Sequence, residues 1–294
     1  TWDASLQHFA ATALTLHLDD STLEGNARIE SFDAPAITFT AALDQFNLDR
    51  YLPPEAKAGA DTKTADNKVA KTSTDKDEAL PLEALRQLNL DGRLGIGHLQ
   101  AFNLRSRDIE IQVKSKDGLL KINPLGAKLY DGAVQGDITL DVRKDTPRFS
   151  INETLTGVQA GPLLKDLTGK EQLLGTASIK ANLSGTGTSS EQIRQTLNGT
   201  AGFEFTDGAV KGVNIASLIR SAQAKIKGQP APKETEPNQT DFALMKGTAT
   251  ITNGKVKNDD LLLKSPLLRI TGAGKVSLPE ETIEAFKEYL IGIK

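Results

Sequence analysis

The stretch LNGTAGFEFTDGAVKGVNIASLI, residues 197–219, contains most of the signals that decide the fold of this chain. It predicts the end of a helix, a strand, a tight turn, a second strand and the start of another helix. Its centre, DGAVKG, is nearly repeated as DGAVQG at residues 131–136. Repeated hairpins of this kind predict a sheet built from antiparallel strands that follow one another along the chain.

Most of the remaining sequence alternates apolar and polar residues, with the period of two that predicts half-buried strands. Examples are IEIQVKS (109–115), DITLDV (137–142) and SIKANLS (178–184). Asx-Gly pairs, which supply the positive φ of two-residue hairpin turns, occur at 117–118, 131–132, 207–208 and 253–254. Strands and turns in this order predict an antiparallel meander.

A second repeat has a longer period. Residues 22–52 align with residues 133–164, and Gly25 then lies opposite Gly136. Each unit is predicted to form a hairpin, a long strand and a short helix. Units of this kind do not close a core alone, so stacking them is expected to extend one sheet.

The predicted helices are few and short. Ser189 or Ser190 is a suitable cap for a helix that runs to Leu197, and Asn214 for a helix over residues 215–226. Two more helices are predicted over residues 81–90 and 161–167.

The C-terminal segment LPEETIEAFKEYLIGIK opens with Pro279 and two glutamates, which is typical of a helix start.

The polar segment 55–78 is almost empty of large apolar residues and is predicted to be disordered. The predicted organisation is a β repeat unit over 1–54, a polar linker over 55–78, a β domain over 79–278 with a mobile loop at 228–239, and an amphipathic helix or tail over 279–294.

The composition disfavours several classes of protein. Apolar residues make up 38% of the chain, its net charge is −3 and its pI is about 5.8. This balance provides no basic surface for nucleic acid. A role at an anionic membrane surface is not favoured either, because it needs clustered Lys and Arg. Because the chain has no cysteine, it has neither a disulfide nor a thiolate site.

No apolar run approaches the roughly 18 residues of a membrane-spanning helix, and no signal peptide is visible. The chain starts at Thr1 without a methionine. We therefore interpret it as a piece of a larger protein, whose anchor or export signal could lie upstream.

The sequence offers little catalytic chemistry. His17 and Asp19 would share one face of a strand, but two ligands do not make a metal site. The segment 272–275 (GAGK) lacks the pattern of a phosphate-binding loop and indicates a glycine-weakened strand. Asp259 and Asp260 are best explained as a solvated turn. We predict no catalytic residue, no metal site and no cofactor, and an enzyme is the least favoured class.

The apolar strand residues are mainly aliphatic, since aromatic residues make up only 5% of the chain. A one-sided aliphatic sheet needs a cover, and the short helices supply too little apolar area. Either the sheet closes on itself or its open face contacts an apolar ligand. The alternation alone favours an ordinary sandwich core. The candidate residues for a ligand-binding wall are Ile109, Ile111, Val113, Ile138, Leu140, Val142, Ile179, Leu183, Phe203 and Phe205.

The order of these signals resembles the AsmA family. Residues 183–219 match its pattern of a strand ending in L-x-G-x-G, a Ser-capped helix, L-x-G, a strand, DG-x-x-x-G and a helix. The block FALMKGTATITNGKVKNDDLLLKSPLLRITGAGKVSL (242–278) follows in the family's order, and FTAALDQFNLDRYLP (39–53) is also similar. The family usually continues with a strand after Leu278, where this sequence favours a helix.

The resemblance implies a mainly β fold with a few short helices, in which an elongated, twisted and curled antiparallel sheet forms a hydrophobic groove. It also implies a periplasmic protein of Gram-negative bacteria, anchored in the inner membrane by a segment absent from this chain. The expected function is to bind phospholipid acyl chains in the groove and to support lipid transport to, or assembly of, the outer membrane. The alternative is a scaffold that binds outer-membrane assembly proteins through sheet edges and holds no lipid.

Overall fold

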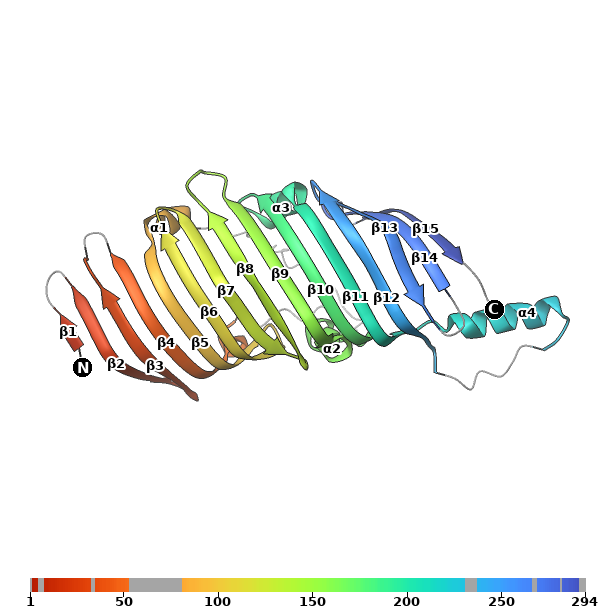
Figure 1. The fold of residues 1–294 in the computed structure, drawn as a ribbon, viewed down its shortest axis with the longest axis horizontal. Helices are drawn as coiled ribbons and strands as arrows, with labels where there is room; N and C mark the ends of the chain where they lie inside the picture. Colours follow the sequence, from red (N-terminus) through yellow and green to blue (C-terminus); the bar gives the residue numbers. More distant parts are fainter. Residues whose placement is uncertain are drawn as a thin grey trace, which may run out of the picture.

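A single sheet dominates the computed structural model, which describes residues 2–4, 8–32, 35–52, 81–230, 237–265, 269–280 and 282–290. The sheet has fifteen strands, and each strand neighbours the next one along the chain (Figure 1). The strands are β1 (Trp2–Ala4), β2 (Phe9–Leu18), β3 (Ser21–Ile29), β4 (Ala36–Asn47), β5 (Asn89–Ala101), β6 (Leu104–Lys116), β7 (Leu119–Leu129), β8 (Gly132–Asp141), β9 (Arg148–Gln159), β10 (Leu173–Thr186), β11 (Asn198–Lys211), β12 (Gln239–Thr252), β13 (Lys255–Lys264), β14 (Arg269–Ser277) and β15 (Thr282–Leu290). The helices are η1 (Leu48–Arg50), α1 (Leu82–Gln87), α2 (Ala160–Thr168), α3 (Ser190–Thr196) and α4 (Ile215–Ile226).

The pairing confirms the predicted meander. All neighbouring strands are antiparallel except β4 and β5, which pair in parallel. The sheet therefore continues from the first predicted β unit into the second. The predicted linker 55–78 lies outside the described residues, as do residues 231–236 of the predicted loop. The predicted repeat has the same order of elements in both copies, namely β3, β4 and η1, then β8, β9 and α2.

Two of the four Asx-Gly pairs form hairpin turns where predicted. Asp117 (φ 49°) and Gly118 (φ 76°) join β6 to β7, and Asn253 (φ 46°) and Gly254 (φ 73°) join β12 to β13. Positive φ at both central residues matches the right-handed twist of the flanking strands.

The other two Asx-Gly pairs do not form the hairpin turns predicted for them. Tyr130 and Asp131 form the turn between β7 and β8, so Gly132 already belongs to β8. Asp207 and Gly208 do not form a hairpin, because they lie at a bulge inside the continuous strand β11. A Cβ on Gly208 would lie 2.2 Å from the carbonyl oxygen of Leu174. Close approach of β10, rather than a turn, therefore explains the glycine.

The helix predictions are largely confirmed. Ser189 caps α3 by accepting a hydrogen bond from the Gln192 amide at 3.2 Å, and Asn214 caps α4 by accepting one from the Ser217 amide at 2.8 Å. The helix predicted over residues 279–294 is wrong. Residues Thr282–Leu290 form β15, which pairs antiparallel with β14.

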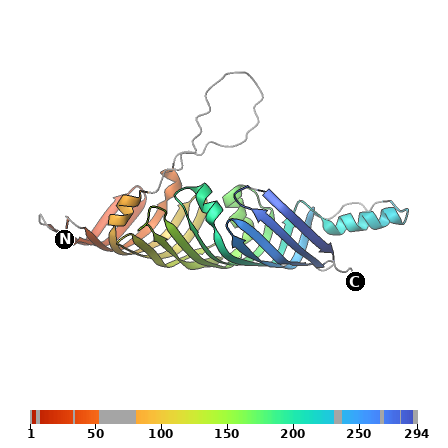
Figure 2. The same ribbon diagram turned by 90° about the horizontal axis from the view of Figure 1, so that it is seen from above.

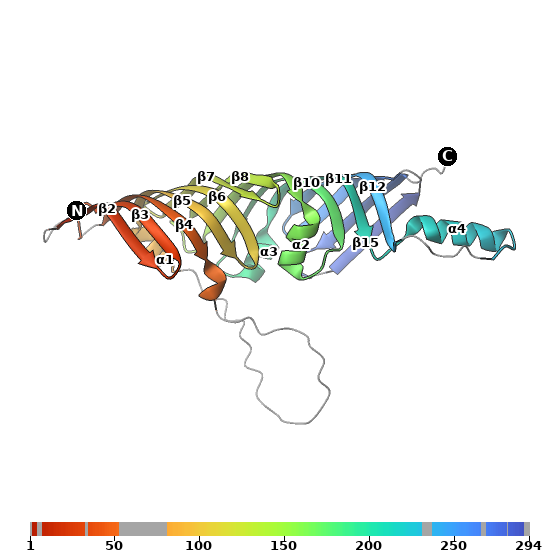
Figure 3. The ribbon, with the colours of Figure 1, turned by 90° about the horizontal axis from the view of Figure 1, so that it is seen from below.

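The sheet is curled, and Figures 2 and 3 show helices α1, α2 and α3 on the same side of it. These helices lie at the two edges formed by the strand ends. Helix α2 contacts β6, β9 and β10, so it reaches across several strand ends. The predicted fold class, an elongated and curled sheet that forms an apolar groove, is confirmed.

Candidate functional site

The strand register places apolar residues in rows that run along the length of the sheet, perpendicular to the strands. In one row each residue is the Cα partner of the next across thirteen strands. Side chains at paired positions point to the same face of a sheet. The row consists of Ala11, Ala27, Phe39, Gly92, Val113, Ile122, Ile138, Ile151, Leu183, Gly199, Ile251, Val256 and Val276. We call the face that carries this row the apolar face.

Parallel rows contain the other predicted residues. Ile111 pairs with Leu94 and Leu125, and Ile109 pairs with Ile96. On the other half of the face, Ile179 pairs with Leu155 and Phe203. Leu140 pairs with Phe149, and Phe205 pairs with Ala177 and Met245. The structure thus brings together all the predicted wall residues except Val142, which follows β8.

Val142 has a structural role at the edge of the sheet. Its amide donates a hydrogen bond to the Gly118 carbonyl at 2.8 Å, and its carbonyl accepts one from Arg86 Nε at 2.7 Å. Only 1% of Val142 is exposed. A residue buried to this extent is unavailable to a ligand.

Partial exposure of most of the apolar face shows that no second sheet among the described residues covers it. Among the predicted wall residues only Ile109 (4% exposed) and Val142 are buried, and all the others are half-buried. In a sandwich, a second sheet would bury these side chains. The described strands form one sheet only. The closed-sandwich alternative is therefore wrong, and the groove is open.

One carboxylate interrupts the rows. Glu153 of β9 pairs with Gly136 on one side and Ala181 on the other. Its row is otherwise apolar or glycine, with Leu14, Gly25, Ala41, Leu94, Ile111, Leu125, Gly136, Ala181, Ala201 and Ala249. Glu153 is therefore the one charged member of this row among the described residues.

The Glu153 carboxylate lies over Gly136, because a Cβ at Gly136 would come within 2.4 Å of Glu153 Oε2. That oxygen is buried and has no hydrogen-bond partner among the described residues. Burial, together with the negative charge of Asp137, raises the pKa of Glu153 above its ordinary value. Burial thus opposes the charged form of Glu153, as expected for a carboxyl group on an apolar surface.

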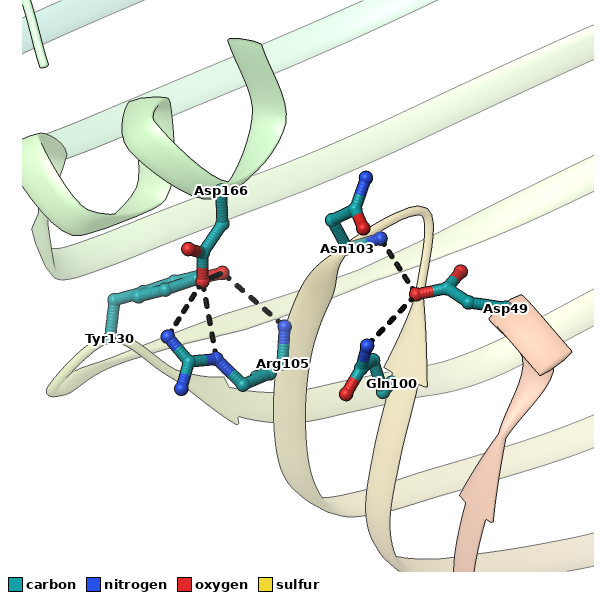
Figure 4. A network of polar contacts seen from close by, with 6 residues as sticks. All are labelled: Asp49, Gln100, Asn103, Arg105, Tyr130 and Asp166. Carbon is teal, nitrogen blue, oxygen red and sulfur yellow. Dashed lines mark hydrogen bonds and ion pairs between the residues drawn. The ribbon is translucent and has the colours of Figure 1, made fainter. Parts of the chain in front are cut away.

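A polar network fixes the edge of the sheet where β5 turns into β6 (Figure 4). Asp49 of η1 accepts hydrogen bonds from the amides of Phe102 and Asn103 and from Gln100 Nε2, the last two at 2.9 and 3.1 Å. Phe102 and Asn103 have φ of 53° and 63°. Desolvation raises the pKa of Asp49, but the three hydrogen bonds outweigh it, and the pKa lies below its ordinary value.

Asp166 of α2 forms the second half of this network. Its Oδ2 accepts hydrogen bonds from Tyr130 Oη at 2.8 Å and from Arg105 Nη2 at 2.9 Å (Figure 4). These two bonds, in that order of importance, lower the pKa of Asp166. The network connects α2 to the first residues of β6 and to the β7–β8 turn, and so holds the helix at the edge of the groove.

Two parts of the apolar face were not predicted from the sequence, namely the contribution of β9 and that of the N-terminal strands. The contribution of β9 could have been found from its alternation, which places Phe149, Ile151, Glu153 and Leu155 on one face of the strand. The N-terminal contribution, which includes Phe39 and Leu43, was missed because its place in the sheet depends on the parallel pairing of β4 with β5.

The part of the chain that the structure describes contains no group of three or more His, Cys, Asp or Glu side chains placed to hold a metal ion. Among its helices, none has the length and apolar character needed to cross a membrane.

Comparison with known proteins decides the family. The sequence model of the AsmA family matches residues 4–261. The chain belongs to the AsmA family. Protein AsmA of Escherichia coli (strain K12) is 27% identical over 289 residues, which cover 96% of this chain and 47% of that protein. The chain thus spans about half the length of this relative. No solved structure matches the chain.

Proposed function

We propose that the apolar face binds the acyl chains of phospholipids and that the chain supports lipid transport to, or assembly of, the outer membrane. The observation that carries this proposal is the continuous row from Ala11 to Val276, whose members lie on an open sheet. Open rows of this length are unusual in a water-soluble surface, since large exposed apolar patches generally mark a binding site.

The physical basis is the burial of methylene groups. Each buried methylene contributes about 0.8 kcal/mol, so a few contacts along one row would retain an acyl chain. The rows offer aliphatic side chains and glycines and almost no hydrogen-bonding side chains. An acyl chain would therefore be held without a fixed register and could slide along the groove. No single wall residue is expected to be essential.

Family membership supports a place in the bacterial cell envelope. We propose a periplasmic location and an anchor in the inner membrane through a part of the protein outside this chain. Phospholipid is the proposed ligand, and outer-membrane assembly proteins are the proposed protein partners. We propose no enzymatic activity, because the sequence offers no recognisable catalytic motif.

A scaffold is the second candidate. Among the described strands, β1 and β15 each have a single neighbour, so their outer edges are open to a further strand. A partner could add to either edge through main-chain hydrogen bonds. In this case the apolar face would be structural and would hold no lipid.

The two candidates differ in whether lipid copurifies with the chain. We would compare Ile111→Asp/Ile138→Asp with Gln112→Asp/Thr139→Asp. The first pair changes the apolar face, and the second introduces the same two carboxylates one residue further along the same strands, on the opposite face. Lipid extracted from each purified protein would be identified and quantified by mass spectrometry, with circular dichroism confirming the fold.

Binding by the groove predicts roughly stoichiometric phospholipid with the unchanged chain and with the Gln112/Thr139 variant, and a loss of most lipid with the Ile111/Ile138 variant. Lipid-free extracts from all three folded proteins would favour the scaffold.

A further inference from the structure

Helix α4 extends beyond the sheet. Figures 1, 2 and 3 all show it projecting past the end that carries β12 to β15. Its main contact with the rest of the described chain is with β12. A helix of twelve residues is about 18 Å long, so most of α4 lies away from the sheet.

The start of α4 is nevertheless firmly attached. The Ile215 amide donates a hydrogen bond to Thr240 Oγ1 at 3.1 Å, and that hydroxyl donates to the Val213 carbonyl at 2.7 Å. Asn214 Nδ2 donates to the Pro237 carbonyl at 3.1 Å. These bonds fix the direction of the helix from its first turn and leave its last turns projecting.

An apolar stripe on α4 is largely uncovered. An adjacent pair, Leu218 and Ile219, lies three and four residues after Ile215 and four and three residues before Ala222, and Ile226 follows four residues later, which places all five on one side of the helix. Leu218 is 62% exposed and Ile226 is 86% exposed. Val213, just before the helix, is 45% exposed. Large aliphatic side chains are rarely this exposed in succession unless the surface binds something.

The charges around the stripe have one sign. Residues 212–230 contain Arg220, Lys225 and Lys227 and no Asp or Glu. The chain as a whole has a net charge of −3, so this cationic segment stands out from its surroundings. A helix with an exposed apolar stripe and only cationic charges has the composition of helices that lie in the interface of a membrane.

We propose that α4 docks the chain on a membrane surface that contains anionic phospholipid. The stripe would lie among the upper acyl segments, while Lys225 and Lys227 remain close to the headgroup phosphates. Because α4 projects from one end of the sheet, docking would bring that end of the groove to the bilayer. Docking does not require that the groove binds lipid, so the two proposals can fail separately.

Flotation with vesicles tests the proposal. The full chain would be centrifuged with phosphatidylcholine vesicles and with vesicles that also contain phosphatidylglycerol. We expect it to float with the anionic vesicles at low salt and much less with the neutral ones. Leu218→Asp/Ile226→Asp should abolish flotation. Lys225→Glu/Lys227→Glu should weaken it at least ten-fold, because each cation near the surface contributes roughly five-fold in affinity.

Lys121→Glu/Lys144→Glu is the matched control, since it makes the same charge change at exposed positions in β7 and in the β8–β9 loop and should float like the unchanged chain. A second measurement uses tryptophan fluorescence. The chain has one tryptophan, Trp2, so Trp2→Phe/Leu218→Trp would report only on α4. Its emission should shift to the blue with anionic vesicles.

The proposal is overturned if the unchanged chain does not float with either kind of vesicle and the tryptophan introduced in α4 keeps a water-exposed spectrum. Flotation that survives the α4 substitutions but is lost with Ile111→Asp/Ile138→Asp would assign membrane contact to the groove instead. Dependence of self-association on Leu218 and Ile226 without flotation would indicate a protein partner for α4 and would also overturn the proposal.

Discussion

At the scale of single residues, Glu153 and Gly136 show how the apolar face accommodates a carboxylate. The absence of a side chain at Gly136 leaves room for the Glu153 carboxylate, which lies in that space with one oxygen buried and unpartnered among the described residues. A buried polar group without a partner destabilises the fold by about 1–3 kcal/mol. This arrangement therefore lowers stability.

We predict that Glu153→Gln stabilises the chain at pH 7 by about 1 kcal/mol, because it removes a partly buried charge. The pKa of Glu153 is raised in the folded state, so the folded chain retains this proton to a higher pH than the unfolded chain. Stability is therefore highest below the unfolded pKa and falls as the pH rises through the folded pKa. Urea denaturation at pH 4 and pH 7 would measure the effect.

The gain from Glu153→Gln should shrink at pH 4, where Glu153 is largely protonated in both states. A variant that is equally or less stable at pH 7 would show that Glu153 has a partner in solution that compensates for its burial.

Glycines show how far single residues can be interpreted from sequence. The pairs at 117–118 and 253–254 correctly predict turns, since both residues have positive φ. The pair at 207–208 contains the same kind of residues, but its glycine is required by the approach of β10. Turn chemistry and close backbone approach select the same residue, and only the neighbouring strand distinguishes them.

At the scale of elements, the network around Asp166 determines whether α2 stays at the edge of the groove. Three hydrogen-bond donors converge on this carboxylate, namely Tyr130 Oη and two nitrogens of the Arg105 guanidinium. A charge-assisted network of this kind restricts both the helix and the β7–β8 turn.

We predict that Asp166→Ala destabilises the chain by about 1 kcal/mol, at the low end for charged hydrogen bonds because Arg105 is largely exposed to solvent. Amide hydrogen exchange should accelerate in α2 and remain unchanged in β11 to β14. Asp145→Ala, at an almost fully exposed carboxylate, is the control. Uniform acceleration across the sheet would contradict a local role for Asp166.

The C-terminal element shows where local propensity loses to tertiary context. Pro279 and two glutamates favour a helix start, and helix propensity differs by only a few tenths of a kcal/mol per residue among ordinary residues. Strand β14 offers an unpaired edge to the residues that follow it. Pairing along β15 satisfies the backbone groups on the edge that the two strands share, and this gain outweighs the local preference.

At the scale of the whole molecule, the open groove results from the order in which the strands pair. Alternation in Ile109–Val113 or Ile138–Leu140 predicts a one-sided strand, but it does not tell whether a second sheet covers that side. Whether a second sheet covers this side depends on long-range strand pairing, above all the parallel pairing of β4 with β5. The family resemblance supplied this part of the prediction, and the alternation alone favoured the wrong, closed arrangement.

The total net charge conceals a local difference in charge along the chain. A value of −3 disfavours contact with an anionic membrane, and it averages over all 294 residues. The cationic and apolar character of α4 emerges only when the structure shows this helix away from the sheet. A local patch, rather than the total charge, determines contact with a surface.

Photo-cross-linking would show whether acyl chains lie along the apolar face. A photoreactive phenylalanine analogue would replace one residue at a time, either in the row or at the neighbouring position on the opposite face. The row positions would be Val113, Ile138 and Leu183, and the neighbours would be Lys114, Thr139 and Asn182.

After irradiation in cells that produce the full-length protein, adducts would be identified by mass spectrometry. We predict phospholipid adducts at all three row positions and few or none at the three neighbours, because only the row contacts acyl chains. Adducts at neither set, or equal adducts at both, in correctly folded protein would contradict this prediction.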